Sequence, residues 1–524
     1  MEVRVARVKT AGAVYKRGMT PGPTPAALER RALALISVLP LVVHLLVGEG
    51  YGYFRDELYY LACAQHLDLG YVDHPPLIVW IVAVVRATLG DSLLALRLVP
   101  ALAHAGTVWT TAAIAAQLGG RRFAQILAAL AALLAPVYLS LASVLSMNAL
   151  DVLLWAVAGL VAIRALRGDS RQWLRFGVVA GLGLLNKLSF VFLGVGLVVG
   201  LVLARRDVFK DRWLWRGAAI AAAIALPHLI WQVMHGWPTL EFMANARAHK
   251  NVALGPLAFL QQQVLQIGPA ALLLWVPGLV WLLAAGAARP YRPLGWAYLA
   301  ILAMMLGTAA KPYYLAPAYT PLLAAGAVVV SAKVSRRGLR ALLVLVLVVC
   351  GLVAMPLARP VLAVESFVAY ADALGMTPKS DERQPLGRLP QFFADMHGWP
   401  EFAATVAIAF KNLPGEEQAV ACVVGRNYGE AGAIDFFGKA LGLPRAISTH
   451  NNYFLWGPRD CSGEVVLMPA KDPDDLREVF SRVEPGAVVD CRDCMPYEDD
   501  LTIWVAREPR RPIAGLWPQL KHYE

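Results

Sequence analysis

The sequence predicts an all-α membrane protein with many spans, followed by a soluble α/β domain. Hydrophobic residues make up 58% of the 524 residues, and charged residues only 16%. Long apolar stretches recur through the first two thirds of the chain instead of gathering around one core, which is typical of a polytopic membrane protein. From about Arg359 onward, apolar and polar residues alternate as they do in soluble domains.

Eleven stretches lack a central charge and are long enough to form a helix within a membrane. They lie at roughly 32–48, 96–118, 123–144, 149–163, 176–186, 188–204, 217–234, 265–286, 294–309, 315–332 and 341–358. The chain is therefore expected to have three regions. These are a basic, disordered N-terminus at 1–31, a membrane domain at 32–358 with a first outer loop at 49–95, and a soluble domain at 359–524.

Lysine and arginine are concentrated in alternate loops, which predicts the orientation in the membrane. The opposite loops hold only Arg55, Arg86, Lys187, Arg247, Lys250 and Lys311. The basic loops are expected to be cytoplasmic, so the N-terminus is cytoplasmic and, after an odd number of spans, the soluble domain is extracytoplasmic. This orientation requires that residues 75–89 lie at the outer interface as an amphipathic helix instead of crossing.

The net charge of +11 comes mainly from these cytoplasmic loops, which would face anionic lipid. Nucleic acid is not an expected partner, because the sequence has no nucleic-acid-binding motif. It also has no glycine-rich phosphate loop of the nucleotide-binding type. Gly181-Leu182-Gly183 lies inside an apolar stretch and is interpreted as a helix-packing contact.

The soluble domain is predicted to alternate strands and helices. Strands are expected at 419–425, 464–470, 486–490 and 501–506, and helices at 400–413, 430–441 and 474–483. Four cysteines, Cys422, Cys461, Cys491 and Cys494, lie in this domain. In an extracytoplasmic domain disulfides are permitted, including one between Cys422 and Cys461, whereas the single C-x-x-C at 491–494 is weak support for zinc or redox chemistry.

Polar residues at the predicted outer face come from several loops and form the candidate site. They are Arg55, Asp56, Glu57, Asp73 and His74 in the first loop, Asn148 and Asp151 in the second, Lys187 in the third, and Lys311 and Tyr313 in the fifth. A carboxylate that takes a proton from a hydroxyl, beside cations that hold a departing phosphate, is suited to glycosyl transfer from a lipid-phosphate donor. Asp56 or Glu57 would be the base, and Lys311, Lys187 or Arg55 would bind the phosphate.

Each of these residues also has an ordinary structural interpretation. Asp56, Glu57 and Asp151 are at positions where a carboxylate stabilises a helix start, although Asp151 could also bind a sugar or metal. His74 could contact substrate or make a loop hydrogen bond. The lysines could extend toward lipid headgroups. A set of tyrosines is expected to form an aromatic belt at the membrane interface: Tyr51, Tyr53, Tyr59, Tyr60, Tyr313 and Tyr314.

Several motifs, taken in order, resemble the family 39 glycosyltransferases, the membrane enzymes similar to protein O-mannosyltransferases and aminoarabinose transferases. The motifs are Asp56-Glu57, Asp73-His74-Pro75-Pro76-Leu77, Leu96-Arg97-Leu98-Val99-Pro100, Arg121-Arg122, Ser146-Met147-Asn148-Ala149-Leu150-Asp151, 181–187, and Lys311-Pro312-Tyr313-Tyr314. The similarity covers roughly residues 32–332.

The resemblance implies a GT-C glycosyltransferase fold, a polyprenyl-phosphate sugar donor and inversion at the anomeric carbon. Asp56 matches the position of the family's catalytic acidic residue, and Glu57 is its neighbour. The acceptor is expected to be an extracytoplasmic lipid, glycan or protein of the cell envelope. A long luminal insertion of the eukaryotic type is missing. No cofactor is clearly implied, and a divalent metal is possible in this family.

Two polar clusters in the soluble domain, at 427–432 and 450–453, resemble the C-terminal domain of one bacterial branch. They follow predicted strands, where ligands often bind, so acceptor binding or a lid over the site is expected, with turn and capping roles as the alternative. A transporter or flippase of lipid-linked sugars is the competing function, and a binding protein that works through its tail is a third. Repeat symmetry and midplane charges would favour the transporter.

Overall fold

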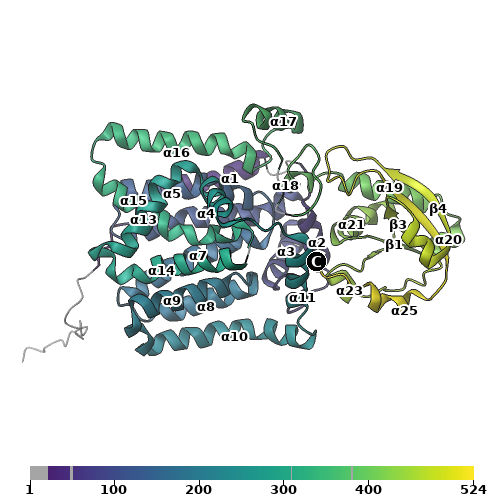
Figure 1. Ribbon diagram of the computed structural model, residues 1–524, viewed down its shortest axis with the longest axis horizontal. Helices are drawn as coiled ribbons and strands as arrows, with labels where there is room; N and C mark the ends of the chain where they lie inside the picture. Colours follow the sequence, from purple (N-terminus) through teal and green to yellow (C-terminus); the bar gives the residue numbers. More distant parts are fainter. Residues whose placement is uncertain (1–21, 48–50, 309, 379, 381) are drawn as a thin grey trace, which may run out of the picture.

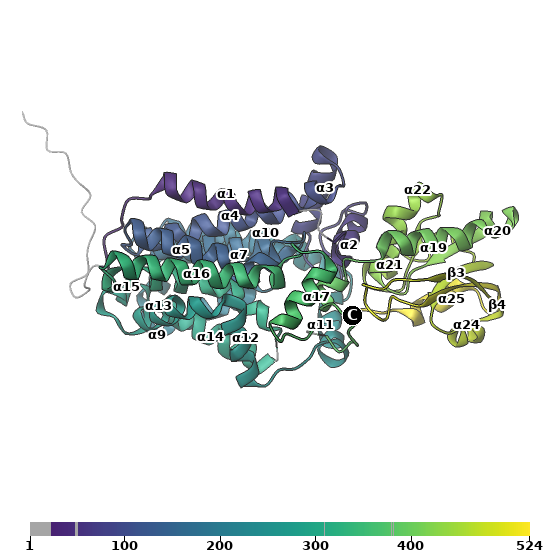
Figure 2. The ribbon, with the colours of Figure 1, turned by 90° about the horizontal axis from the view of Figure 1, so that it is seen from above.

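The computed structural model describes residues 22–47, 51–308, 310–378, 380 and 382–524. A bundle of helices forms one part of the molecule, and a domain built on a β-sheet lies beyond one end of the bundle (Figures 1 and 2). This architecture confirms the predicted fold class. Residues 1–21, where disorder is expected, lie outside the described residues. Residues 26–29 hydrogen-bond to the bundle, for example from the Ala26 N–H to the Ala116 carbonyl.

Each predicted apolar stretch forms a helix or a broken pair of helices. These are α1 (Arg30–Val47), α4 (Leu93–Gln117), α5 (Arg122–Leu134) with α6 (Pro136–Leu141), α7 (Met147–Leu166), α8 (Gln172–Asn186), α9 (Phe190–Ala204), α10 (Arg212–Met234), α12 (Pro256–Ile267) with α13 (Leu272–Ala284), α14 (Arg292–Thr308), the 3₁₀ helix η5 (Pro312–Tyr319) with α15 (Thr320–Lys333), and α16 (Arg337–Ala358).

By length and composition, six of the described helices are able to cross a membrane. A seventh span results if α12 and Pro269–Ala284, which meet at a bend of 95°, are counted together. Other helices in the bundle are shorter, such as α5 with 13 residues and α9 with 15. Eleven spans therefore stay a prediction.

Three short helices lie at the end of the bundle that faces the sheet domain: α2 (Arg55–Cys63), α3 (Leu77–Leu89) and α11 (Pro238–Asn245) (Figure 1). α3 buries one face, including Ile78 and Val82, and exposes Val84 on another. This two-faced apolar helix agrees with the interfacial helix expected at 75–89.

The basic loops meet at the other end of the bundle. The Arg167 guanidinium donates to the Gln117 carbonyl (3.1 Å), and that of Arg205 donates to the Leu166 carbonyl (3.3 Å). Arg340, near the start of α16, lies over the Phe123 ring. α16 runs from this end toward the sheet domain (Figure 1). The positively charged loops thus lie at the same end of the bundle, as the predicted orientation in the membrane requires.

Glycines allow α8 and α10 to approach closely. A Cβ added to Gly177 would lie 2.1 Å from the Gly217 carbonyl oxygen, and one added to Gly181 would lie 2.6 Å from the Ile224 Cβ. Neither space accommodates a side chain, so larger residues would force these helices apart. The helix-packing interpretation of Gly181 is confirmed.

The sheet has five strands in the order β2-β1-β3-β5-β4, and β1 pairs in parallel with both β2 and β3, whereas β5 is antiparallel to β3 and β4. The strands are β1 (Ala421–Val424), β2 (Ala446–Ile447), β3 (Val465–Ala470), β4 (Phe480–Val489) and β5 (Leu501–Pro509). The helices of this half are α17 (Val364–Ala373), α18 (Gln391–Ala394), α19 (Trp399–Lys411), α20 (Gly415–Val420), α21 (Tyr428–Ala433), the π-helix η6 (Ile434–Gly438), α22 (Lys439–Leu441), α23 (Asn452–Leu455), α24 (Asp474–Val479), α25 (Ile513–Leu516) and the 3₁₀ helix η7 (Trp517–Leu520).

Two predictions for this domain are wrong in detail. The helix expected at 474–483 ends at Val479, and β4 begins at Phe480 rather than at 486. Pro485 and Gly486, which break a strand pattern, lie at a register shift where β4 bulges against β5. The short strand β2 was not predicted, because two residues carry too little pattern.

Cys422 and Cys461 form a disulfide with Cα atoms 5.6 Å apart, which links β1 to the loop before β3. Cys491 and Cys494 are also paired with each other. The structural interpretation of these cysteines is therefore favoured over metal binding. Cys63 and Cys350 are free thiols.

Candidate active site

The candidate site starts at α2, which lies between the bundle and the sheet domain (Figure 2). Asp56 and Glu57 both lie in its first turn. Consecutive residues of a helix point in directions about 100° apart, so the two carboxylates face different surroundings. Their contacts separate the two roles that the sequence leaves open.

Glu57 is fully buried and makes hydrogen bonds through both oxygens. Oε1 accepts from the Arg97 Nε (2.9 Å) and the Leu145 N–H (2.7 Å), and Oε2 accepts from the Arg97 Nη2 and the Phe54 N–H, both at 2.8 Å. The Phe54 contact caps α2, and the others hold this helix against α4 and the loop before α7. Glu57 thus has the contacts of a structural ion pair.

Asp56 is different, because about a third of its side chain is exposed (32%). Its Oδ1 accepts a hydrogen bond from the Tyr428 hydroxyl at 2.9 Å, and the Arg55 Nε lies 3.9 Å away. The carboxylate is held in place but still reachable. Of the two neighbouring acids, only Asp56 has an accessible carboxylate.

Tyr59 and Tyr60 are buried, with exposed fractions of 1% and 3%. The Tyr59 ring lies 4.6 Å from that of Tyr428 and 6.4 Å from that of Tyr453, both in the sheet domain. The belt interpretation is wrong for this pair, because a belt would face lipid and water. The sheet domain covers Tyr59, and Tyr60 packs beside Tyr59 and His74. The sequence pattern does not reveal a cover that lies so far along the chain.

Asp73 and His74 lie in the loop between α2 and α3. The Tyr59 hydroxyl donates to the Asp73 Oδ1 (3.0 Å), and burial raises the pKa of Asp73 despite the opposing effects of His74 and Tyr59. The His74 ring is buried against Tyr71 and Tyr60, and its Nδ1 donates to the Pro75 carbonyl (3.0 Å). The loop hydrogen bond expected for His74 is therefore present.

Asn148, Lys187 and Tyr313 come together from three parts of the bundle. The Lys187 amine hydrogen-bonds to the Asn148 Oδ1 and lies 5.4 Å from the Tyr313 ring centre. Asp151 is buried one turn further along α7, where the Ser189 hydroxyl lies 2.8 Å from both of its carboxylate oxygens. Asp151 contacts the Ser189 side chain instead of a helix-start N–H group, so it links α7 to the residue just before α9.

A second charged cluster joins the bundle to residue Glu382. Its Oε1 lies 3.0 Å from the Lys311 amine and 3.8 Å from that of Lys250, and its Oε2 accepts from Gln391 (2.7 Å). Burial opposes ionisation of Glu382, yet the charges of Lys250, Arg55 and Lys311 hold its pKa well below the usual range. Lys311 is thus paired with a carboxylate rather than extended toward headgroups.

Arg55 connects Asp56 with the cluster around Glu382. Its guanidinium donates to the Tyr497 hydroxyl (3.0 Å), lies 3.7 Å from Asp395, and covers the Tyr428 ring at 5.3 Å. Burial raises the pKa of Asp395 to about 6, although the nearby Arg55 acts in the opposite direction. One region of mixed charge between the bundle and the sheet domain therefore contains Asp56, Arg55 and the two lysines that pair with Glu382, which are Lys250 and Lys311.

The polar clusters of the sheet domain are buried. Asn427 caps α21 through the Gly429 and Glu430 N–H groups, and Glu430 pairs with Arg426. His450 accepts the Tyr428 N–H at its Nδ1 (3.2 Å). The capping role is thus present, while acceptor binding by these clusters stays a prediction.

Sequence reasoning gave no individual site role to Arg97, Glu382, Asp395 or Tyr428, although Tyr428 lies in the cluster at 427–432 that was expected to bind the acceptor or cover the site. Arg97 had one signal, an arginine inside an apolar stretch, which needs a buried partner. The other three lie more than 300 residues from Asp56 in the sequence. Only the docking of the sheet domain brings them to the membrane domain.

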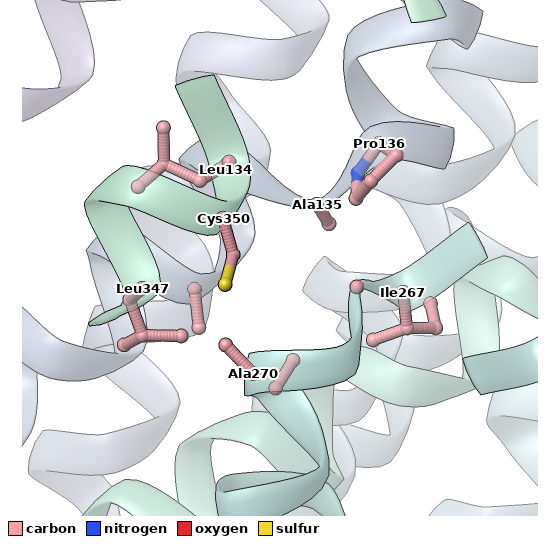
Figure 3. Close-up of a pocket in the computed structure, with 11 residues that line it drawn as sticks. Leu134, Ala135, Pro136, Ile267, Ala270, Leu347 and Cys350 are labelled. Atoms are coloured by element: carbon pink, nitrogen blue, oxygen red, sulfur yellow. The ribbon is translucent and has the colours of Figure 1, made fainter. Parts of the chain in front are cut away.

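An apolar pocket lies in the bundle between the end of α5, the break between α12 and α13, and α16. Leu134, Pro136, Ile267 and Leu347 line it, and the Cys350 sulfur points into the hollow (Figure 3). Among the described residues, no group of three or more histidine, cysteine and acidic side chains is arranged to hold a metal ion.

Comparisons with known proteins find similarity to glycosyltransferases. A model of the family described as dolichyl-phosphate-mannose-protein mannosyltransferase matches residues 73–231. The lipid A galacturonosyltransferase RgtD of Rhizobium johnstonii is 28% identical over 192 residues, which span 36% of this chain and 40% of RgtD.

Two solved structures of ArnT from Cupriavidus metallidurans share the fold over 91% of this chain and 98% of theirs, at 15% identity. The structure bound to undecaprenyl phosphate has a TM-score of 0.62, and the apo structure 0.60. The chain therefore shares the fold of ArnT over nearly its whole length, and its residues 73–231 resemble a glycosyltransferase family.

Proposed function

We propose that the chain is a membrane glycosyltransferase that moves a sugar from a polyprenyl phosphate to an extracytoplasmic acceptor, with inversion. The observation that carries the proposal is Asp56, a partly exposed carboxylate held at 2.9 Å by Tyr428 beside a cluster of cations. The fold shared with ArnT, which has been crystallised with undecaprenyl phosphate, supports a polyprenyl-phosphate donor.

In the proposed reaction, Asp56 accepts the proton of the acceptor hydroxyl. The hydroxyl oxygen forms a bond to the anomeric carbon as the bond from that carbon to the phosphate oxygen breaks. The polyprenyl phosphate leaves with the electron pair, and a single displacement of this kind inverts the anomeric centre. Lys311, Lys187 and Arg55 are proposed to offset the charge that develops on the phosphate.

The donor's prenyl chain is proposed to lie against the apolar helices, and the hollow of Figure 3 offers one such surface. The names of the similar proteins differ in acceptor, since one family acts on protein and RgtD on lipid A. The proposal therefore covers lipid, glycan and protein acceptors of the cell envelope. It makes no assignment of the sugar.

Transport of a lipid-linked sugar is the competing function. Transport is disfavoured because the charged residues gather at one end of the bundle, namely Asp56, Asp73, Lys250 and Lys311. Transporters instead place their substrate sites near the midplane of the membrane. A purified transferase releases polyprenyl phosphate from its donor in detergent, and a transporter does not. Mass spectrometry of envelope glycans and polyprenyl-phosphate sugars in a deletion strain would identify the donor for this assay.

Topology provides the first prediction. Alkaline phosphatase fused after Arg359 is expected to be active, because the sheet domain is proposed to be extracytoplasmic, and a fusion after Arg206 is expected to be inactive. The physical reason is the basic-loop asymmetry of the bundle. The fusions are compared at equal expression, and the reverse pattern would contradict the orientation.

Lys311 provides the second prediction. In the proposed donor complex the phosphate takes the place of the Glu382 carboxylate, which now lies 3.0 Å from the lysine. Lys311→Met is expected to raise the apparent donor KM roughly 10- to 100-fold, since a hydrogen bond to a charged group contributes about 1.5–3 kcal/mol. Donor saturation curves of the purified protein measure the effect.

Two further variants test the assignment of Lys311. Lys521→Met removes a lysine that pairs with Glu241 at the surface and is expected to leave the donor KM unchanged. Glu382→Gln removes the competing carboxylate and is expected to keep or lower the donor KM. An unchanged donor KM in Lys311→Met would leave this lysine with a structural role only.

A further inference from the structure

Two acidic side chains of the proposed site, Asp56 and Asp73, accept hydrogen bonds that depend on the sheet domain. The Tyr428 hydroxyl donates directly to the Asp56 Oδ1 at 2.9 Å, although the two residues are 372 positions apart. Tyr428 is the first residue of α21, directly after the loop that follows β1. The sheet domain therefore reaches the candidate base with one specific side chain.

Asp73 is held indirectly by Asn452, the first residue of α23 in the same domain. The Asn452 N–H donates to the Tyr59 oxygen (3.2 Å), and the Tyr59 hydroxyl donates to the Asp73 Oδ1 (3.0 Å). The Asn452 side chain also accepts the Val72 N–H at 2.6 Å. Loops after two adjacent parallel strands thus fix the orientation of two carboxylates in the membrane domain.

The position of the Tyr428 hydroxyl is determined from several sides. Its ring stacks near Tyr59, with centroids 4.6 Å apart, and the Arg55 guanidinium lies 5.3 Å from the ring centre. Its backbone N–H donates to His450, and Asn427 caps the helix that it begins. A side chain so enclosed has few alternative rotamers, so its hydrogen bond to Asp56 costs little entropy at the moment of reaction.

Charged groups of both signs and neutral hydroxyls face Asp56. The charged groups are Arg55 and Asp73 of the first outer loop, Lys250 of the fourth, and Asp395, and the neutral hydroxyls are those of Tyr60 and Tyr428. The Tyr428 hydroxyl that donates to Asp56 fixes one carboxylate oxygen, and this limits the orientations that the other oxygen can take toward an acceptor.

We propose that Tyr428 is a positioning residue of the transferase and that the sheet domain completes the active site by placing its hydroxyl on Asp56. The inference rests on the proposed role of Asp56 as the base. It assigns the sheet domain a part in the chemical step itself, beyond any contact with the acceptor.

The test is Tyr428→Phe in the full-length protein, which removes the hydroxyl and keeps the ring against Tyr59 and Arg55. We expect kcat for polyprenyl phosphate release to fall roughly 10- to 100-fold, since a positioned base contributes about 10²–10⁴ and only part of this depends on orientation. The donor KM is expected to be unchanged.

Tyr453→Phe is the matched control. Tyr453 is buried in the same domain, and its hydroxyl donates to Asp435 at 2.9 Å. Its loss should affect stability without lowering kcat of the folded protein. As a rescue, 4-aminophenylalanine at position 428 returns a donor to the same ring and should restore most of kcat.

The outcomes distinguish the two levels of the argument. Wild-type transfer by Asp56→Asn would overturn the proposed base and this inference with it. If Asp56→Asn is inactive while Tyr428→Phe keeps the wild-type kcat, only the inference is overturned. Equal losses of kcat in Tyr428→Phe and Tyr453→Phe would also overturn it, because they would show a purely structural role.

Discussion

Asp56→Asn is expected to lower kcat for sugar transfer by at least about a hundredfold, the usual contribution of a general base. Asparagine has nearly the same shape, and its side-chain oxygen can still accept the Tyr428 hydroxyl that now donates to Asp56 at 2.9 Å. What is lost is the ability to take a proton from the acceptor. Polyprenyl phosphate release by purified protein, measured with donor binding, gives kcat separately from affinity.

Asp68→Asn is a suitable control for this variant. Asp68 lies in the same outer loop, is exposed, and uses its carboxylate to accept the neighbouring Leu69 N–H. Its neutralisation changes the charge of the loop equally but leaves the site intact, so transfer should be unchanged. Full activity of a correctly inserted Asp56→Asn protein would exclude Asp56 as the base.

The membrane half of the fold was largely predictable, because a lipid environment makes apolar length a direct signal of helices. The soluble half was predictable where strands are continuous, as in β1, β3 and β5. β4 was shortened in the prediction, since Pro485 and Gly486 interrupt its pattern at a bulge that only the pairing with β5 explains. The sequence around Pro485 does not show that β5 pairs with β4 on both sides of the bulge.

The candidate site was predictable only in its local part. The pair Asp56-Glu57 was visible as charge beside an apolar stretch, yet nothing in two adjacent acids indicates which one is buried. The burial of Glu57 depends on Arg97, 40 residues away, which pairs with the Glu57 carboxylate. The Asp56 carboxylate stays partly exposed. The contacts to Glu382 and Tyr428 depend on domain docking, and a single sequence has no signal for docking.

The buried pair of Glu57 and Arg97 leads to the second large prediction. Glu57→Gln is expected to destabilise the protein by about 3–5 kcal/mol, because it leaves the Arg97 charge buried without a partner. The amide also has only one acceptor oxygen for four N–H donors, and its own NH₂ would face donors. Unfolding of the detergent-solubilised protein by heat or by SDS measures the loss.

A double variant separates the charge from the packing. In Glu57→Leu with Arg97→Met both charges are gone, so the penalty of an unpaired ion disappears, and the double variant should be more stable than Glu57→Gln. The fraction of Glu57→Gln that stays folded should keep near-normal kcat, since Asp56 is still in place. Normal stability with a hundredfold loss of kcat would instead make Glu57 the base, and four hydrogen bonds to a fully buried carboxylate argue against that result.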